Sequence, residues 1–232
     1  MFLYQPAEGY RYNSDSIFLY SFISSFAPKG TLLDIGCGVG IISLLLSRDF
    51  DIETTVIDKQ ESMLLYAKHN YAINGLKVDY YLDDITSWSS KQRFDTVVSN
   101  PPFYHSSVTQ SENNHINIAR YSHHMPLREL IYSAKRLLKP RGYFIFCYDA
   151  KQIDSILFYL NESKLNPEVV RFVHSKIDRE SKLVFISARA NSKSMTRVMP
   201  PLVVFNEDGE YTDEAQRAFD MASTHSIKAE MV

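Results

Sequence analysis

Short apolar runs alternate along this chain with longer segments in which apolar and polar residues mix. The apolar runs predict strands at Thr31–Ile35, Glu53–Ile57, Val78–Leu82, Phe94–Ser99 and Gly142–Tyr148. The mixed segments predict helices at Ile41–Arg48, Gln60–Asn74, Leu127–Leu138 and Gln152–Glu162. Strands that are apolar at nearly every position are typical of parallel strands covered on both faces. The alternation therefore predicts a doubly wound α/β sheet.

Further elements are predicted at both ends of this pattern. Two apolar runs, Val169–His174 and Leu183–Arg189, are close in sequence and predict an antiparallel hairpin at the edge of the sheet. With this hairpin, we expect a mostly parallel seven-stranded sheet with helices on both faces. Near the N-terminus, Asn13 or Ser14 predicts the N-cap of a helix that runs to Phe26.

The composition is typical of a soluble globular protein. Of the 232 residues, 45% are hydrophobic and 22% are charged, which is enough apolar material for one sizeable core. We expect one domain, residues 1–232, with an N-terminal segment at residues 1–27 and a C-terminal tail at residues 200–232. No signal peptide or membrane span is apparent, and Cys37 and Cys147 are interpreted as reduced thiols. Together these features predict a cytoplasmic protein without a membrane partner.

The charges are unevenly distributed along the chain. The formal net charge of −2 argues mildly against a nucleic-acid partner. From Arg171 to Arg197, however, seven basic residues stand against two acidic ones, whereas the chain is mainly acidic from Asn206 onwards. The basic stretch is compatible with a phosphate-binding face and equally with the solvated rim of a hairpin.

A glycine-rich loop, Asp34-Ile35-Gly36-Cys37-Gly38-Val39-Gly40, joins the first of these strands to its helix. Glycines at such a turn let a ligand approach the backbone closely. Asp58, at the tip of the next strand, is an acid suited to the two hydroxyls of a ribose. A dinucleotide fingerprint would place its third glycine where Ile41 stands, so the loop instead resembles the S-adenosylmethionine (SAM) pattern. The alternative is a glycine-rich turn without a ligand.

A second motif, Asn100-Pro101-Pro102-Phe103, follows the predicted strand Phe94–Ser99. The side-chain oxygen of Asn100 and the carbonyl oxygen of Pro101 can accept the two hydrogens of a planar amine. The ring of Phe103 can stack on the heterocycle that carries this amine, and the two prolines stiffen the loop. Taken alone, an Asn-Pro pair is also ordinary turn punctuation.

The polar signals follow the ends of different strands. The glycine loop, Asp58, Asp83-Asp84 and Asn100 each come directly after an apolar run. Because the carboxyl ends of parallel strands meet at one edge of the sheet, we expect all four in one ligand-binding cleft.

Together the motifs resemble those of the SAM-dependent amino-methyltransferases. Over almost its whole length the chain resembles one family, the bacterial methyltransferases that modify adenosine 37 of valine tRNA at its 6-amino group. The resemblance rests on the segments Gly9–Leu19, Asp34–Gly40, Asp84-Ile85 with Trp88, Asn100–Phe103, Ala119–Tyr121 and Asp208–Thr212. It implies a Rossmann-like class I SAM-dependent methyltransferase fold. The chain departs from the family at Tyr20, where a small residue is common, and at Phe103, where tyrosine is common.

The motifs and the resemblance assign residues to each part of the site, with residues 1–27 covering the cofactor. SAM is expected to be bound by Arg11, Asp15, Asp34, Gly36, Gly38, Gly40, Asp58, Lys59, Asp84, Ile85 and Asn100. Asn100, Pro101 and Phe103 are expected to be catalytic. Contacts to a tRNA anticodon loop are expected from Phe103, Tyr104, Arg120, Lys176, Arg179 and Lys182. No metal is expected, because the spacing of His105, His115, His123 and His124 fits no standard site.

The implied reaction is transfer of the sulfonium methyl of SAM to the exocyclic amine of an adenine. Asn100 and Pro101 would orient that amine, so that positioning rather than a strong base accelerates the reaction. One alternative is methylation of a glutamine amide in a protein, which poses the same geometric problem. Another is a non-catalytic RNA-binding protein that keeps the fold. The sequence leaves the oligomeric state open and is compatible with a monomer.

Overall fold

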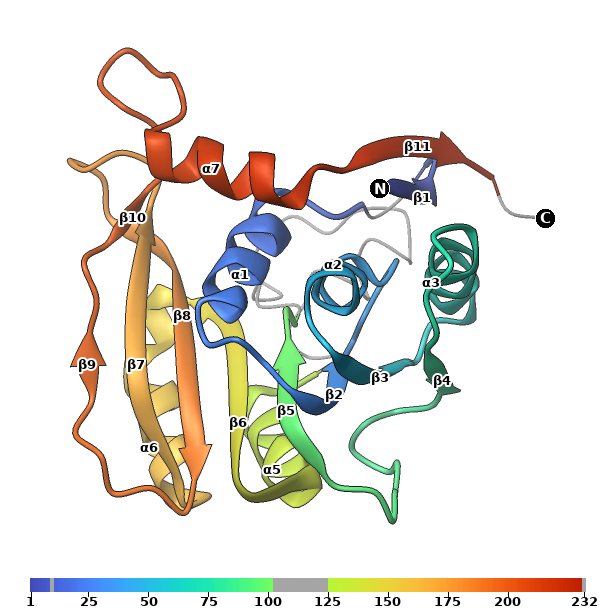
Figure 1. Ribbon diagram of the computed structural model, residues 1–232. Helices are drawn as coiled ribbons and strands as arrows, with labels where there is room; N and C mark the ends of the chain where they lie inside the picture. The colour runs from blue at the N-terminus through green and yellow to red at the C-terminus, as the bar shows by residue number, and fades with distance from the viewer. Residues whose placement is uncertain (9–10, 102–124, 231–232) are drawn as a thin grey trace.

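The computed structural model describes residues 1–8, 11–101 and 125–230. Its centre is a twisted sheet whose described strands follow the order β10-β7-β8-β6-β5-β2-β3-β4, with β9 beside β7 (Figure 1). The strands are β2 (Gly30–Ile35), β3 (Ile52–Asp58), β4 (Asp79–Leu82), β5 (Phe94–Ser99), β6 (Leu138–Asp149), β7 (Leu165–His174), β8 (Ser181–Ala190), β9 (Arg197–Val198) and β10 (Leu202–Val203). Strand β8 is antiparallel to both β6 and β7, and the other described pairings in this sheet are parallel.

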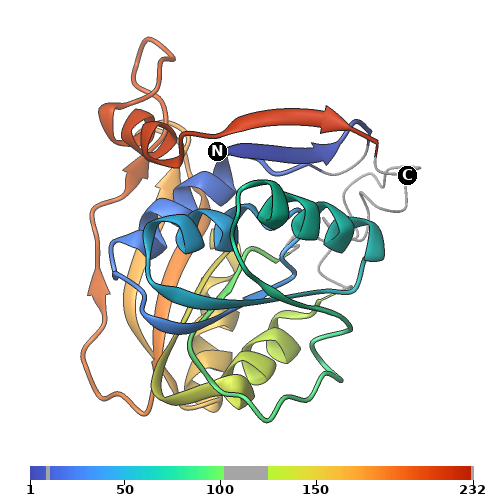
Figure 2. The same ribbon diagram turned by 45° about the vertical axis from the view of Figure 1, so that its right-hand side comes forward.

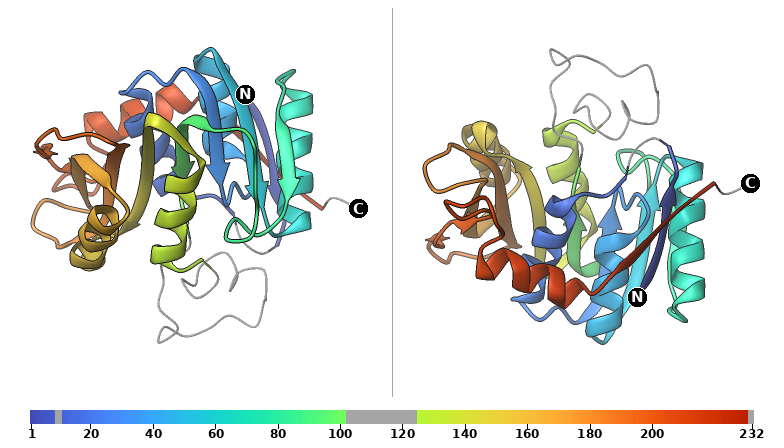
Figure 3. Two further views of the ribbon diagram at one scale, coloured as in Figure 1. Left: turned by 90° about the horizontal axis from the view of Figure 1, so that it is seen from below. Right: turned by 90° about the horizontal axis from the view of Figure 1, so that it is seen from above.

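Helices cover both faces of the sheet (Figures 2 and 3). One face carries α1 (Ser14–Ser24), α2 (Ile41–Asp49) and α3 (Glu61–Ile73), and the other carries α5 (Leu127–Leu137) and α6 (Ile153–Glu162), the latter directly after the short 3-10 helix η2 (Ala150–Gln152). In α5, apolar residues at helical spacing, Leu127, Leu130, Ile131, Ala134 and Leu137, are all buried in the core of that face. Within the described part of the chain, no helix combines the length and the apolar character needed to cross a membrane.

The topology confirms the predicted fold class. The seven predicted strands are all present, and β5 has the predicted bounds. The predicted antiparallel pair is formed by β7 and β8, but it is not the outermost part of the sheet, because β9 and β10 both pair with β7. Each of these two strands has only two residues, which is too short for a period-2 pattern to be recognised in the sequence.

The two ends of the chain pair with each other. Strands β1 (Phe2–Pro6) and β11 (His225–Ala229) form a parallel two-stranded ribbon next to α3 (Figure 1). The side chains of Asn70 and Asn74, on or next to α3, hydrogen-bond the backbone of β1. Before β11, α7 (Asp213–Ala222) packs on α1. The segment that the sequence suggested was a tail therefore contains a helix and a strand that hold the start of the chain.

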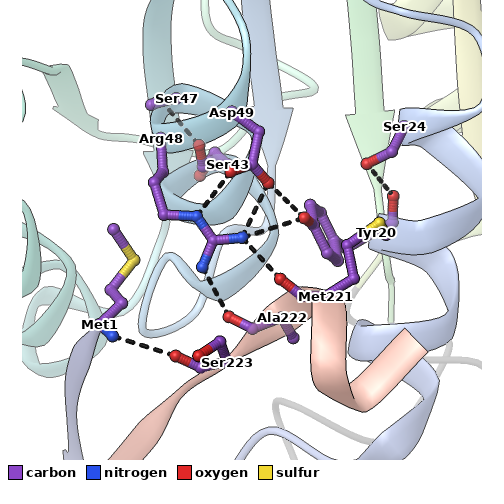
Figure 4. Close-up of polar contacts among 10 residues, drawn as sticks. All are labelled: Met1, Tyr20, Ser24, Ser43, Ser47, Arg48, Asp49, Met221, Ala222 and Ser223. Carbon is purple, nitrogen blue, oxygen red and sulfur yellow. Dashed lines mark hydrogen bonds and ion pairs between the residues drawn. The ribbon is translucent and has the colours of Figure 1, made fainter. Parts of the chain in front are cut away.

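A polar cluster around Arg48 ties α7 to α1 and α2 (Figure 4). The guanidinium of Arg48 donates to the carbonyl oxygens of Met221 at 2.8 Å and Ala222 at 2.6 Å, which end α7. It also donates to the hydroxyl of Tyr20 at 3.1 Å, and Asp49 accepts hydrogen bonds from both Arg48 and Tyr20. A cation placed here meets the partial negative charge of the last carbonyls of a helix.

Candidate active site

A cleft lies at the carboxyl ends of β2, β3 and β5, where the sequence predicted a ligand. Its walls come from the start of α1, the glycine loop, the tips of β3 and β5, the turn after β4 and Met125, two residues before α5. The lining residues are Tyr12, Ser16, Asp34, Gly36, Cys37, Gly38, Val39, Ile41, Ile42, Ile57, Asp58, Lys59, Gln60, Met63, Asp83, Asp84, Ile85, Asn100 and Met125. The predicted convergence of the glycine loop, Asp58, Asp83-Asp84 and Asn100 is therefore found in the structure.

The glycine loop is held in place by the carboxylate of Asp58. Oδ2 of Asp58 accepts the backbone N–H of Gly38 at 2.9 Å, and Oδ1 accepts that of Gln60 at 2.9 Å. Gly36 and Gly38 have φ angles of +67° and +56°, a left-handed conformation that side chains other than glycine adopt only with strain. Asp58 thus braces the loop from the neighbouring strand, a role that the sequence did not indicate.

Asp34 is a buried carboxylate with spare hydrogen-bonding capacity. It is only 2% exposed, and its Oδ2 has no hydrogen-bond partner. Burial raises the pKa of Asp34 to about 7, although hydrogen bonds from Ser43 oppose the rise. A buried acceptor without a partner is costly unless something else satisfies it. Since Asp34 lines the cleft, it is suited to a ligand group that donates hydrogen bonds or carries positive charge.

Asp84 is the ionised acid on the other side of the cleft. Its Oδ1 accepts hydrogen bonds from the backbone N–H and the hydroxyl of Thr86, at 2.9 and 2.7 Å. Burial alone would raise the pKa of Asp84, but these hydrogen bonds and the charge of Lys59 outweigh it and lower that pKa. Ile85 next to it is buried and offers an apolar surface. This pairing of an acceptor with an apolar side chain suits a polar heterocycle.

Asn100 stands at the tip of β5 with one half of its amide engaged and the other half unpaired. Its Nδ2 donates to Oγ of Ser16 at 3.1 Å, and its buried Oδ1 has no partner. The strand below is fixed to β2, because the hydroxyl of Ser99 donates to the carbonyl of Ile35 at 2.8 Å. Pro101 is buried. The structure therefore places a hydrogen-bond acceptor in the cleft, as the motif predicted.

Not every predicted site residue lies in this cleft. Gly40 is the N-cap of α2 and is not among the lining residues. Arg11 is exposed, and the carboxylate of Asp15 accepts a hydrogen bond within its own turn, from the side chain of Asn13. Neither residue lines the cleft. The predicted site residues Phe103, Tyr104 and Arg120 lie outside the described residues. The same holds for Pro102 of the motif and for the four histidines His105, His115, His123 and His124. Their assignments stay predictions.

The structure also adds residues to the cleft that the sequence analysis did not assign. Tyr12, Ser16, Gln60, Met63 and Met125 all line it. Tyr12 and Ser16 belong to residues 1–27, the segment that was expected to cover the cofactor. That expectation was the one feature of the sequence that could have placed them in the cleft. Gln60, Met63 and Met125 carry no motif, and only the folded chain brings them here.

The three predicted substrate-binding cations lie elsewhere, in a second hollow at the β7–β8 turn. Lys176, Arg179 and Lys182 line it together with Lys151. Part of the charge of the basic stretch is used inside the protein, since Arg171 makes a bidentate ion pair with Glu214 at 2.7 and 2.8 Å. Among the described residues, no group of three or more His, Cys, Asp or Glu is arranged to hold a metal.

Comparison with known proteins places this site in a family. The profile of the methyltransferase small domain family matches residues 13–170. A tRNA1(Val) (adenine(37)-N6)-methyltransferase of Phocaeicola vulgatus is 30% identical over 158 residues, which cover 67% of this chain and 67% of the relative. The protein of the same name from Photorhabdus laumondii is 30% identical over 205 residues, which cover 82% of this chain and 80% of the relative. The chain belongs to this methyltransferase family.

Solved structures agree with this at the level of fold. A protein described as a predicted O-methyltransferase from Agrobacterium tumefaciens superposes with a TM-score of 0.70 at 13% identity, covering 92% of this chain and 99% of that one. An N-methyltransferase from Bradyrhizobium japonicum in complex with S-adenosyl-L-homocysteine gives a TM-score of 0.54 at 18% identity, covering 77% and 86%. At these identities the similarity shows the class I methyltransferase fold alone.

The cofactor of this methyltransferase is SAM, and the cleft fits it. SAM carries an amino group, a ribose with two hydroxyls and an adenine, and the cleft presents a matching donor or acceptor for each. The unpaired Oδ2 of Asp34 suits the amino group, Asp58 has spare lone pairs for ribose hydroxyls, and Asp84 with Ile85 suits the adenine. At Gly38 no heavy atom lies within 4 Å of the position that a Cβ would take, so the loop backbone is open to close approach there.

Proposed function

We propose that this methyltransferase transfers the methyl group of SAM to the 6-amino group of an adenine in tRNA, adenosine 37 of a valine tRNA. The observation that carries the proposal is the unpaired Oδ1 of Asn100 in the cleft. The names of the relatives support the choice of nucleic acid and position. An anticodon-loop base is already unpaired, so moving it into the cleft costs less than flipping it out of a duplex.

The chemistry requires positioning of a weak nucleophile. SAM supplies an electrophilic methyl, whereas the adenine amine is poorly nucleophilic because its lone pair is delocalised into the ring. Oδ1 of Asn100 and the carbonyl of Pro101 accept the two amine hydrogens and draw the nitrogen towards tetrahedral geometry. Positive charge develops on the nitrogen as it reacts, and two fixed acceptors stabilise that charge. As the nitrogen–carbon bond forms, the carbon–sulfur bond would break and S-adenosylhomocysteine would leave as a neutral thioether. The methylated nitrogen would then be acidic and would lose its extra proton to water, so no strong base is needed.

Replacing Asn100 by alanine tests this assignment. We expect Asn100→Ala to lower the rate of methyl transfer to tRNA by about 100-fold or more and to leave the affinity for SAM within about twofold, because the lost acceptor faces the amine rather than the cofactor. The rate is measured with radiolabelled SAM and unmodified tRNA followed by nucleoside analysis, and the affinity by calorimetry. Asn166→Ala, outside the cleft, is the control. A rate near that of the wild type in Asn100→Ala would refute the role of this residue.

We further propose that the hollow at the β7–β8 turn contacts the phosphates of the same tRNA. In the sheet register, Ser99 at the tip of β5 is level with Phe146, Ile186 and Val170 on the next three strands. His174, at the end of β7, is four residues beyond that level, which corresponds to about 13 Å along the strand direction. Strand β7 is three strands away from β5, which corresponds to roughly 14 Å across the sheet. RNA whose base occupies the cleft would therefore pass this turn.

Four cations line the hollow, against two acids. Lys151, Lys176, Arg179 and Lys182 face Asp178 and Glu180, and the nearest Arg179–Asp178 approach is a long 3.9 Å between exposed side chains. An exposed pair of this kind contributes little and leaves the guanidinium available to phosphate.

Neutralising these cations should change the salt dependence of tRNA binding. In the triple variant Lys176→Gln, Arg179→Gln and Lys182→Gln, we expect the slope of log affinity against log salt to fall by about 2–3, since each phosphate contact contributes close to one unit. A matched triple variant removes the same charge near the amino ends of β2, β4 and β5, at the opposite end of the strands from the cleft. It consists of Lys29→Gln, Lys77→Gln and Lys91→Gln. Equal slopes in the two triple variants would mean that net charge, and not this hollow, attracts the RNA.

A further inference from the structure

We propose that Ser16 is a positioning residue for methyl transfer: its hydroxyl holds the amide of Asn100 so that Oδ1 faces the substrate amine. This inference rests on the function proposed above, because it assigns the task of orienting the acceptor that the reaction needs. Ser16 touches Asn100 and not the reacting nitrogen.

The contact joins two parts of the chain that are 84 residues apart. Oγ of Ser16 lies 3.1 Å from Nδ2 of Asn100, both residues line the cleft, and Ser16 is only 4% exposed. The opposite atom of the same amide, Oδ1, is buried without a partner. One hydrogen bond therefore fixes the direction in which the free acceptor points.

The amine itself decides which orientation of the amide is productive. A hydroxyl can either accept or donate, so Ser16 alone is compatible with the amide in both orientations. The substrate amine offers hydrogens, however, and an Nδ2 turned towards it would place donor against donor. In the productive orientation Oδ1 faces the amine, Nδ2 faces away, and the oxygen of Ser16 accepts from it. A partner that only donates would hold the amide in the wrong orientation.

The first turn of α1, which carries Ser16, is held in place by hydrogen bonds before it and by buried side chains after it. The side chain of Asn13 caps α1 by accepting the N–H of Asp15, and the N–H of Ser16 donates to the carbonyl of Asn13 at 3.2 Å. Ile17, directly after it, and Leu19, three residues after Ser16, are buried in the core. The first turn of α1 is thus anchored on both sides of Ser16. Such anchoring is required if the hydroxyl of Ser16 is to hold the side chain of Asn100, at the tip of β5, in one orientation.

The test is Ser16→Ala, with Ser133→Ala as control. Ser133 is a buried serine of α5 outside the cleft lining, so its replacement reports the general cost of removing a buried hydroxyl. In Ser16→Ala we expect kcat for methylation of tRNA to fall between about 10- and 100-fold, while the affinity for SAM and the melting temperature stay close to those of Ser133→Ala. Loss of SAM affinity in proportion to kcat would show that Ser16 holds the cofactor and would overturn the proposal.

A second measurement needs no substrate. The side-chain amide resonances of Asn100, identified by their absence in Asn100→Ala, should move in Ser16→Ala towards the shifts of a free amide and stay in place in Ser133→Ala. Unchanged resonances, or a kcat within twofold of wild type, would overturn the role of Ser16. If wild-type protein does not methylate tRNA at all, the proposed function fails, whereas the resonances still decide whether Ser16 orients Asn100.

Discussion

At the scale of single residues, two buried carboxylates of the cleft behave differently because their partners differ. Asp58 uses both oxygens to hold backbone N–H groups, and burial nevertheless raises its pKa. Asp34 is equally enclosed but keeps one oxygen without a partner. Desolvation disfavours a charge most where hydrogen bonds do not compensate for it. Asp58 therefore holds the glycine loop in place as well as offering its remaining lone pairs to a ligand, whereas Asp34 keeps a whole oxygen free for one.

The pKa of Asp34 makes the stability of the cofactor-free protein depend on pH. Its folded-state pKa of about 7 lies above the 3.8 that is ordinary for an aspartate side chain and describes the unfolded state, so the folded state binds more protons than the unfolded state between these values. The free energy of unfolding should therefore fall as pH rises from about 4 to 7 and level off above. In Asp34→Asn this component is absent. Denaturant unfolding of the wild type and of Asp34→Asn at several pH values measures this component. If the free energies of unfolding of the two proteins changed in parallel with pH, Asp34 would not have a raised pKa.

At the scale of elements, the ends of two helices decide how the cleft is framed. Asn13 caps the start of α1, next to Ser16 in the cleft, and the hydroxyl of Thr212 caps the start of α7 by accepting the N–H of Ala215. These caps are local and can be read from sequence. The C-terminal end of α7 is different, because its carbonyls are satisfied by Arg48, which lies in another helix far away in sequence.

Removing Arg48 should loosen the contact of α7 with the core. We expect Arg48→Ala to lower the free energy of unfolding by about 1–3 kcal/mol, because two helix-end carbonyls and Asp49 lose a charged donor at a half-buried site. Denaturant unfolding measures the change. Arg93→Ala, an exposed arginine that bonds only to carbonyls of its own loop in the described structure, is the control. Equal stabilities of the two variants would show that Arg48 does not anchor α7.

At the scale of the whole molecule, the C-terminal strand closes the structure onto the N-terminal segment. Besides its pairing with β1, β11 accepts a hydrogen bond from the hydroxyl of Tyr66 at its Ala229 carbonyl, at 2.7 Å. The terminal amine of Met1 donates to the carbonyl of Ser223 at 3.0 Å (Figure 4). Shortly after β1 the chain reaches Tyr12, in the cleft. The last strand of the sequence therefore helps to hold the wall of the cofactor site.

Ending the chain after Ser223 tests this connection. Without β11, the segment before α1 has to be ordered when SAM binds, and that ordering reduces the net affinity. We expect the dissociation constant for SAM to rise about tenfold, which corresponds to 1.4 kcal/mol. A chain that ends after Glu230 keeps β11 and is the control. Calorimetry measures both, and equal affinities would show that β11 does not support the cleft.

The sequence by itself determined most of the sheet and the motifs of the cleft. The strands β2, β3, β5 and β6 are long, apolar and flanked by strong turn signals, so their pattern is set by burial on both faces. Four polar residues follow strands or stand near their ends: Asp34, Asp58, Asp84 and Asn100. They meet because the carboxyl ends of parallel strands lie at the same edge of the sheet. The terminal strands, in contrast, are short segments whose pattern favours no single partner.

Only the tertiary structure decided which distant residues complete the site. Ser16 reaches Asn100, Asp58 braces Gly38, and Arg48 ends α7, and each contact joins segments that have no local relation. The physical reason is that local sequence sets backbone propensity and burial pattern, whereas the direction of a side chain across a gap depends on how whole elements pack. The predicted chemistry of the cleft was therefore readable in the chain, but the groups that orient it were not.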